Sequence, residues 1–160
     1  YLNVGSAWGV AAGNPKNFDP SDPCGTTIAV QTGTAQEEYA ATLSDECVAA
    51  GKNKITVMPH ELQTDIATKL IGGQYDATLA DSTVIGYTSS QSAGKIEQLG
   101  DTFESAPQGV AVAKDDAQLA EAVQKAMQHL MDNGYLNDIL ASYGAENAAL
   151  TTATLNPSVD

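Results

Sequence analysis

Short apolar runs alternate with segments of helical periodicity along most of the chain. The runs predict strands over residues 7–12, 27–30, 54–58, 75–79, 95–99 and 108–113. Between and after them, residue spacing and capping signals predict helices over residues 35–50, 61–71, 83–90, 117–133 and 135–143. This repeated order of strand and helix predicts an α/β fold with a largely parallel sheet.

The segment TTIAVQTGTAQEEY, residues 26–39, joins one of these strands to a helix. Gly33 supplies a turn, and Thr34 is followed three residues later by Glu37, the spacing of a capping box. The turn and the helix N-terminus would direct free backbone N–H groups into one small concavity, which suits an anion such as a carboxylate. The glycine pattern is neither a Walker loop nor G-x-G-x-x-G, so a nucleotide is disfavoured. The alternative is that the turn binds nothing, as most such turns do.

Asp81 stands just past the apolar strand predicted over residues 75–79. Open α/β sheets bind ligands at the carboxyl edge of their strands, and the turn around Thr34 and Ala35 is expected at that same edge. A carboxylate facing a group of N–H donors suits a zwitterion, whose ammonium would contact Asp81. The alternative role for Asp81 is the N-cap of the next helix.

The charge of the chain excludes several partners. Twenty Asp and Glu residues against seven Lys and Arg give a formal net charge of −13. Because no basic cluster is present, a nucleic acid or an anionic membrane surface is not an expected partner. No apolar run approaches the length of a membrane span. The chain begins at Tyr1 without Met or a visible signal peptide, so a mature or trimmed piece is expected.

Catalytic signals are sparse. His60 and His129 have no sequence neighbours that would complete a triad or a metal site. Ser6 and Ser82 lack the context of a nucleophile elbow. We therefore expect neither an enzyme nor a cofactor or metal.

Cys24 precedes the strand at residues 27–30, and Cys47 falls near the end of the following helix. In a βα unit the helix runs back along its strand, so the start of the strand and the end of the helix lie together. A disulfide is therefore expected between the two, and with it an oxidising, extracytoplasmic location. The alternative is a pair of unbridged small hydrophobic residues.

Three segments resemble the family-3 extracellular solute-binding proteins of ABC importers, which capture polar amino acids and have the periplasmic-binding-protein-like type II fold. CGTTIAVQTGTAQEEY resembles the family's strand and capped helix, and LIGGQYDATLADS resembles its segment ending in Asp. The third, GVAVAKDDAQLAEAVQKAMQHLMDNGYLNDILASYG, resembles its closing strand and helices. The paired Cys24 and Cys47 resemble actinobacterial members. The resemblance covers essentially the whole chain.

The resemblance implies two α/β lobes that are joined by two crossing strands and close on a ligand. Residues 1–13 would hold the first crossing strand, and residues 14–108 the second lobe with a parallel-rich sheet. Residues 109–146 would hold the second crossing strand and the helices that pack on the first lobe, and residues 147–160 an extended tail. The family's contacts match Gly33, Thr34 and Ala35 for the ligand α-carboxylate and Asp81 for its α-amino group. The family often has Thr or Ser where Ala35 stands, which keeps the backbone N–H and loses a hydroxyl.

The resemblance also implies a missing part. Tyr1 matches the tyrosine of the family's Pro-Tyr pair, so the first lobe lacks its N-terminal part and the arginine that pairs with the ligand carboxylate. We therefore expect a fragment whose C-terminal helices expose an apolar face, and which covers it by association with a second copy or by exchange of elements.

The implied function is the extracytoplasmic substrate-binding component of an ABC amino-acid importer, which delivers its ligand to a permease and is lipid-anchored at full length. One alternative is an enzyme on the same fold, such as a cyclohexadienyl dehydratase, which would need an acid–base residue beside Asp81. Another is a self-associating fragment that binds no ligand. The sequence does not indicate which amino acid is bound.

Overall fold

A five-stranded mixed sheet forms the centre of the molecule. The computed structural model describes residues 1–157, and its strands lie in the order β3-β2-β4-β1-β5. The strands are β1 (Leu2–Ala11), β2 (Thr27–Gln31), β3 (Thr56–His60), β4 (Ala77–Asp81) and β5 (Ile96–Gln108). Strands β3, β2 and β4 are parallel, whereas β1 runs antiparallel to both β4 and β5. The parallel part of the sheet brings the carboxyl ends of β2 and β4 to one edge.

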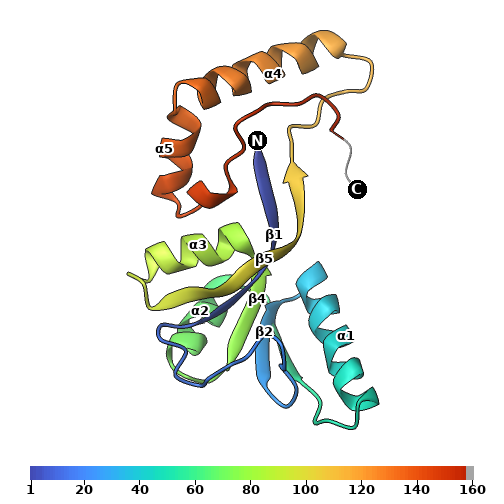
Figure 1. Ribbon diagram of the computed structural model, residues 1–160, viewed down its shortest axis with the longest axis vertical. Helices are drawn as coiled ribbons and strands as arrows, with labels where there is room; N and C mark the ends of the chain where they lie inside the picture. Colours follow the sequence, from blue (N-terminus) through green and yellow to red (C-terminus); the bar gives the residue numbers. More distant parts are fainter. Residues whose placement is uncertain (158–160) are drawn as a thin grey trace.

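Helices cover both faces of this sheet (Figure 1). Helix α1 (Ala35–Ala49) buries Ala40 and Cys47 in a core that includes Trp8 and Leu79. On the other face, α2 (Gln63–Ile71) contributes Ile66 and Leu70 to a second core. Helix α3 (Ser82–Gln91) lies on this same face, where it packs against β1 and β4. The apolar spacing of the sequence thus produces the predicted α/β fold.

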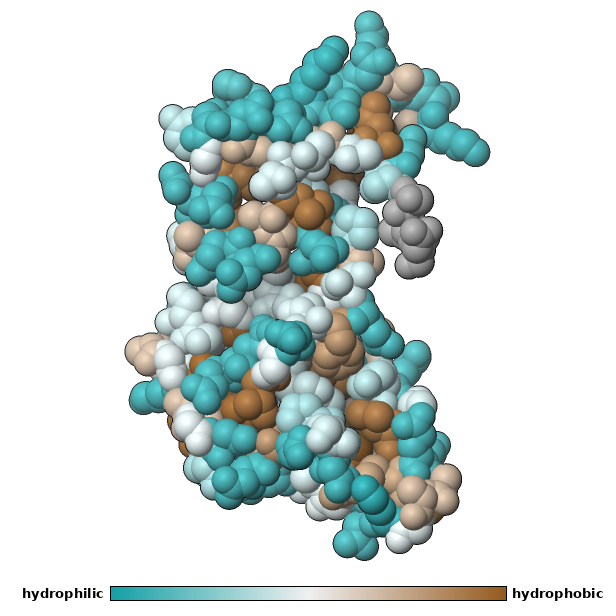
Figure 2. Space-filling model, viewed as in Figure 1, coloured by the Kyte–Doolittle hydropathy of each residue, from teal (hydrophilic) through white to brown (hydrophobic). Residues whose placement is uncertain are grey.

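The C-terminal part stands beyond the end of β5 (Figure 1). It consists of α4 (Ala117–Asp132), α5 (Tyr135–Ser142) and the short 3-10 helix η1 (Glu146–Ala148). Asp116 caps α4 by accepting a hydrogen bond from the Leu119 N–H at 2.9 Å, as its position predicted. No residue of α4 is buried, but apolar side chains such as Met127 and Leu130 are only partly exposed above the tail; Figure 2 shows apolar side chains at the surface in this part of the molecule.

The tail crosses under α4 in an irregular extended form. Gln128 accepts the Ala153 N–H at 2.9 Å, and Gln124 donates to the Ala153 carbonyl at 2.9 Å. Leu2 pairs with Ala149, so the tail also lies beside the start of β1. The predicted tail is therefore extended except for the turn of η1; its residues 158–160 lie outside the described residues.

The prediction of separate strands over residues 95–99 and 108–113 is wrong. One strand, β5, runs from Ile96 to Gln108, and residues 109–113 form no regular element. The sequence GDTFESAP within β5 is polar and contains Gly100 and Pro107, which is typical of a loop. It forms a strand because β1, itself almost wholly buried, supplies backbone partners along the full length of β5 at the edge of the sheet.

Asp76, just before β4, has a structural role. Its carboxylate accepts the Thr27 N–H at 2.7 Å and lies 3.4 Å from the Lys16 ammonium. We expect Asp76→Ala to lower the free energy of unfolding by about 1–3 kcal/mol, because a partly buried N–H loses its acceptor. Chemical denaturation would measure this loss. Asp22→Ala is the matched control, because its exposed pair with Lys52 should cost less than about 1 kcal/mol.

Candidate functional site

Among the described residues, the Asp81 carboxylate has no hydrogen-bonding or ion-pairing partner. Asp81 ends β4 and occupies the N-cap position of α3, but its side chain makes no capping hydrogen bond. Within residues 1–157 it also forms no ion pair. The alternative role as a side-chain cap is therefore absent from this structure. A half-buried carboxylate without a partner is costly unless a ligand or water supplies the hydrogen bonds.

The N-terminus of α1 lies at the same edge. Thr34 caps the helix by accepting the Glu37 N–H at 3.3 Å, and it donates to the Gln31 carbonyl at 2.7 Å. The Glu37 carboxylate accepts the N–H of Gly33, one residue before the cap, at 2.7 Å, so only the Thr34 half of the predicted capping box is formed. Over residues 1–157, neither the Thr34 nor the Ala35 N–H donates to a protein acceptor. Of the three predicted donors, the Gly33 N–H is thus already in use by Glu37.

Strand pairing brings this helix terminus and Asp81 together. Val30 of β2 is paired with Leu79 of β4, so Asp81 and the turn after β2 both follow directly from that pair. Ser6 of β1 lies opposite Asp81, and the Gln36 amide of α1 donates to the Ser6 hydroxyl at 3.1 Å. The predicted juxtaposition of Asp81 with the start of α1 is therefore present.

Ser6 and Gln36 were not expected at this site. Ser6 is buried, and its polar side chain interrupts the run of buried, mostly apolar residues in β1. That interruption is the one signal that could have marked it. Gln36 carries no signal of its own, because a polar residue in the first turn of a helix is ordinary.

Comparison with curated proteins finds a relative over nearly the whole chain. The arginine-binding protein ArgT of Corynebacterium glutamicum is 37% identical over 157 residues, which are 98% of this chain and 51% of that protein. No protein-family model matches the chain. This similarity supports the resemblance to the family-3 extracellular solute-binding proteins. It spans about half the length of the curated relative it matches.

Solved structures agree with this family. A substrate-binding protein of a polar amino acid ABC uptake transporter from Streptococcus thermophilus superposes with a TM-score of 0.71 at 18% identity, over 94% of this chain and 57% of that one. An ancestral arginine-binding protein bound to arginine gives a TM-score of 0.61 at 25% identity, over 89% of this chain and 61% of that one. The α/β fold of the type II periplasmic binding proteins is thus confirmed, and the family's members are extracytoplasmic.

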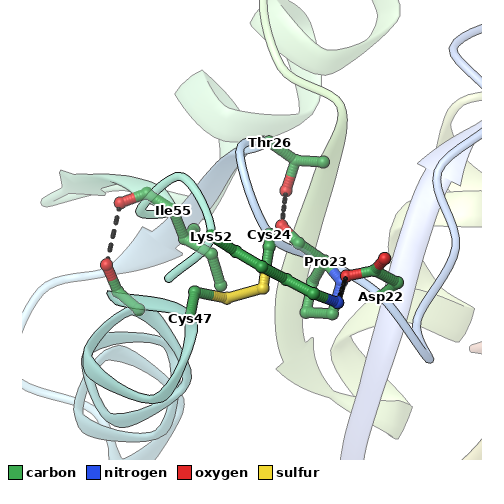
Figure 3. Close-up of a disulfide and its surroundings, with 8 residues drawn as sticks. Asp22, Pro23, Cys24, Thr26, Cys47, Lys52 and Ile55 are labelled. Atoms are coloured by element: carbon green, nitrogen blue, oxygen red, sulfur yellow. Dashed lines mark hydrogen bonds and ion pairs between the residues drawn. A yellow bond between two sulfur atoms is a disulfide. The ribbon is translucent and has the colours of Figure 1, made fainter. Parts of the chain in front are cut away.

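The predicted disulfide is present (Figure 3). Cys24 and Cys47 are bonded, with 5.6 Å between their Cα atoms, at the end of the βα unit remote from Asp81. Lys52 and Asp22 form an ion pair beside it at 2.9 Å. The bridge therefore ties the loop before β2 to the end of α1, and fixes the helix whose other end lies at the site.

The two histidines lie away from this site. The His60 ring hydrogen-bonds the Tyr75 hydroxyl at 2.6 Å on the α2 side of the sheet, and His129 is exposed on α4. Among residues 1–157, no group of three or more His, Cys, Asp or Glu residues is placed to hold a metal ion. None of the helices described there is long and apolar enough to cross a membrane.

Burial raises the pKa of Asp81 above its ordinary 3.8. Because burial penalises the charged form, ionised Asp81 lowers the stability of the folded state at pH values above its folded-state pKa. Below pH 3.8 the carboxyl is neutral in both the folded and the unfolded state, so this loss disappears. Asp81→Asn should therefore be more stable than the parent at pH 7. This advantage should disappear as the pH falls through the raised pKa toward 3.8. Thermal unfolding of both proteins across pH 3–7 measures this difference, and a constant difference would contradict it.

Proposed function

We propose that this chain supplies one side of an amino-acid-binding site in an ABC importer's extracytoplasmic binding protein. The ligand ammonium binds Asp81, and its carboxylate binds the N-terminus of α1 at Thr34 and Ala35, with Gly33 stabilising the turn. The observation that supports this most strongly is the unpartnered, half-buried Asp81 carboxylate beside open helix N–H groups. The carboxylate and the helix terminus have opposite electrostatic preferences, which match the two ends of a zwitterion.

We propose further that the ligand is a cationic amino acid of the arginine type. The relative from Corynebacterium glutamicum is named an arginine-binding protein. The surroundings of Asp81 are acidic: Glu37 lies at the start of α1, and Glu104 follows Phe103, the β5 partner of Ser6. Burial raises the pKa of Tyr39 on α1, and the charge of Glu104 raises it further, so the Glu104 carboxylate lies near α1. Such a field favours a ligand with net positive charge.

The site is open on one side. Two surface hollows of the described residues are lined by other residues, one beneath α4 and the tail, the other between α3 and residues 144–150. In the proposed whole protein a first lobe faces Asp81 and closes over the ligand, which is then passed to a permease. Lipid anchoring of that protein, and self-association of this chain through α4, stay predictions.

A thermal-shift screen against the free amino acids, under non-reducing conditions, tests the proposal. We expect arginine and lysine to raise the melting temperature more than glutamine, and glutamate not at all. A ligand that binds the native state alone stabilises it by an amount that grows with its concentration over Kd. A flat response to every amino acid from a cooperatively melting protein would show that this chain binds none on its own.

Ala35→Thr should strengthen binding. The substitution adds a hydroxyl beside the N–H that the ligand carboxylate uses, and one hydrogen bond is worth about 0.5–1.5 kcal/mol, or roughly 2- to 12-fold in Kd. Isothermal titration with arginine measures the change. Ala41→Thr, farther along the exposed surface of α1, is the control for the substitution itself. If Ala35→Thr and Ala41→Thr bind arginine with equal affinity, the ligand carboxylate does not bind beside the Ala35 N–H.

A further inference from the structure

Two glycines bring the C-terminal part into backbone contact with α3. A Cβ atom on Gly86 of α3 would overlap the carbonyl oxygen of Gly144, and one on Gly144 would lie 2.6 Å from the carbonyl oxygen of Gly86. Gly144 also has φ of +67°, a conformation that side chains disfavour. Neither backbone could approach this closely with any other residue.

Helix α3 and the C-terminal part meet at Gly86 and Gly144 through van der Waals packing, without a hydrogen bond between them in the described part of the chain. The rings of Tyr87 and Tyr143 stack beside it, with centroids 5.9 Å apart, and both side chains are exposed. Over the described chain, no hydrogen bond joins α3 to residues 135–150. Two surfaces that meet in this way can separate or press together without breaking directional bonds.

This contact and the candidate site lie on opposite sides of the connecting strands (Figure 1). Helix α3 packs through Ile85 on Ala7 and Ala80. Ser6, which precedes Ala7 in β1, has its side chain on the other face of the sheet, where it contacts Gln36 of α1 beside Asp81. The face that holds the glycine contact is therefore the reverse of the face that holds the site.

The connecting strands are irregular between these two features. The β1–β5 pairing shifts register on both sides of the Ser6–Phe103 pair. Glu104 has φ of +49°, and a Cβ on Gly5 would lie 2.8 Å from the Cα atom of Ser105. Bulges bend a strand and interrupt its pairing, so they offer a pivot at Ser6, level with Asp81.

We propose that the Gly86–Gly144 contact is a stop that sets the angle between the α/β part and the C-terminal helices. Because the stop and Asp81 lie on opposite sides of the pivot, added volume at Gly86 tilts the C-terminal helices toward α1 and Asp81. The inference rests on the proposed function only for the position of the site. The stop itself acts without a ligand.

Distances between two spin labels test this directly. Both native cysteines are in the disulfide, so Asp45→Cys on α1 and His129→Cys on α4 can be labelled selectively under non-reducing conditions. Both positions are exposed. In this background we expect Gly86→Ala to shift the main distance to shorter values. Tyr87→Ala, which removes the stacked pair, should broaden the distribution. Gly109→Ala is the matched control, because it lies in the connection after β5 and a Cβ there meets no atom within 4 Å.

The outcomes separate this inference from the proposed function, because the measurement needs no amino acid. An unchanged distribution in both Gly86→Ala and Tyr87→Ala would overturn the stop. If Gly86→Ala does not fold, the breadth measured for Tyr87→Ala decides alone. A shift in the distances together with a flat amino-acid screen would support the stop and contradict the binding function.

Discussion

Asp81→Asn is expected to weaken arginine binding by between roughly 10- and 150-fold. The reason is the loss of a charge-assisted hydrogen bond to the ligand ammonium, which contributes about 1.5–3 kcal/mol. The asparagine keeps the size of the side chain, and without a buried charge it should not destabilise the fold. Isothermal titration at pH 7 measures the change in Kd.

Asp65→Asn is the matched control for this loss. Asp65 lies in the first turn of α2, exposed and on the far side of the sheet from α1. The Asp65→Asn substitution removes the same charge from the molecule. It should change Kd by less than about twofold, because exposed charges farther apart than the Debye length are screened. Equal effects of the two substitutions would show that net charge, and not a contact with Asp81, drives binding.

Removal of the disulfide is expected to produce the largest loss of stability. Cys24 and Cys47 are 23 residues apart, and closing a loop of that length in the unfolded chain contributes about 3.5 kcal/mol in the chain-entropy model. For a chain of this size the double variant Cys24→Ala/Cys47→Ala should melt roughly 7–14 °C lower. Differential scanning calorimetry of the two proteins measures the shift.

Ser44→Ala serves as the control for local packing around the bridge. Ser44 donates to the Ile55 carbonyl at 3.1 Å next to the disulfide, so its loss perturbs the same region without opening the loop. It should cost about 1 kcal/mol. A double cysteine variant that melts no lower than Ser44→Ala would show that the bridge contributes little beyond its own packing.

The α/β core was predictable because its signals are local. The strand at residues 27–30, the Thr34 cap and the apolar spacing on α1 act over a few residues, and each has the predicted place in the structure. The disulfide followed from the same local geometry, since a helix that runs back along its strand must bring Cys47 near Cys24.

Strand β5 could not be read from its own residues. Its polar middle, with Gly100 and Glu104 at positive φ, forms a strand only because β1 lies beside it. Strand structure that depends on a partner distant in the sequence is invisible to local patterns. The same limit hid the contact between Gly86 and Gly144, which are 58 positions apart in the sequence and meet only in the folded chain.

The relative position of the candidate site residues was predictable, whereas their hydrogen bonds were not. The sequence placed Asp81 and Ala35 at one edge of the sheet, which the pairing of β2 with β4 bears out. It did not show that Glu37 already accepts the Gly33 N–H, or that Gln36 reaches across to Ser6. Those bonds depend on side-chain positions that strand and helix periodicity do not specify.

The most direct test is an NMR titration of the uniformly ¹⁵N-labelled chain with L-arginine. We expect the amide signals of Ala35 and Gln36 to shift together with those of residues 80–82, and Asp81→Asn to remove these shifts. Such a readout detects weak binding to an open site as well as tight binding. Shifts confined to other residues, or none at millimolar arginine, would contradict the assignment of amino-acid binding to Asp81 and the N-terminus of α1.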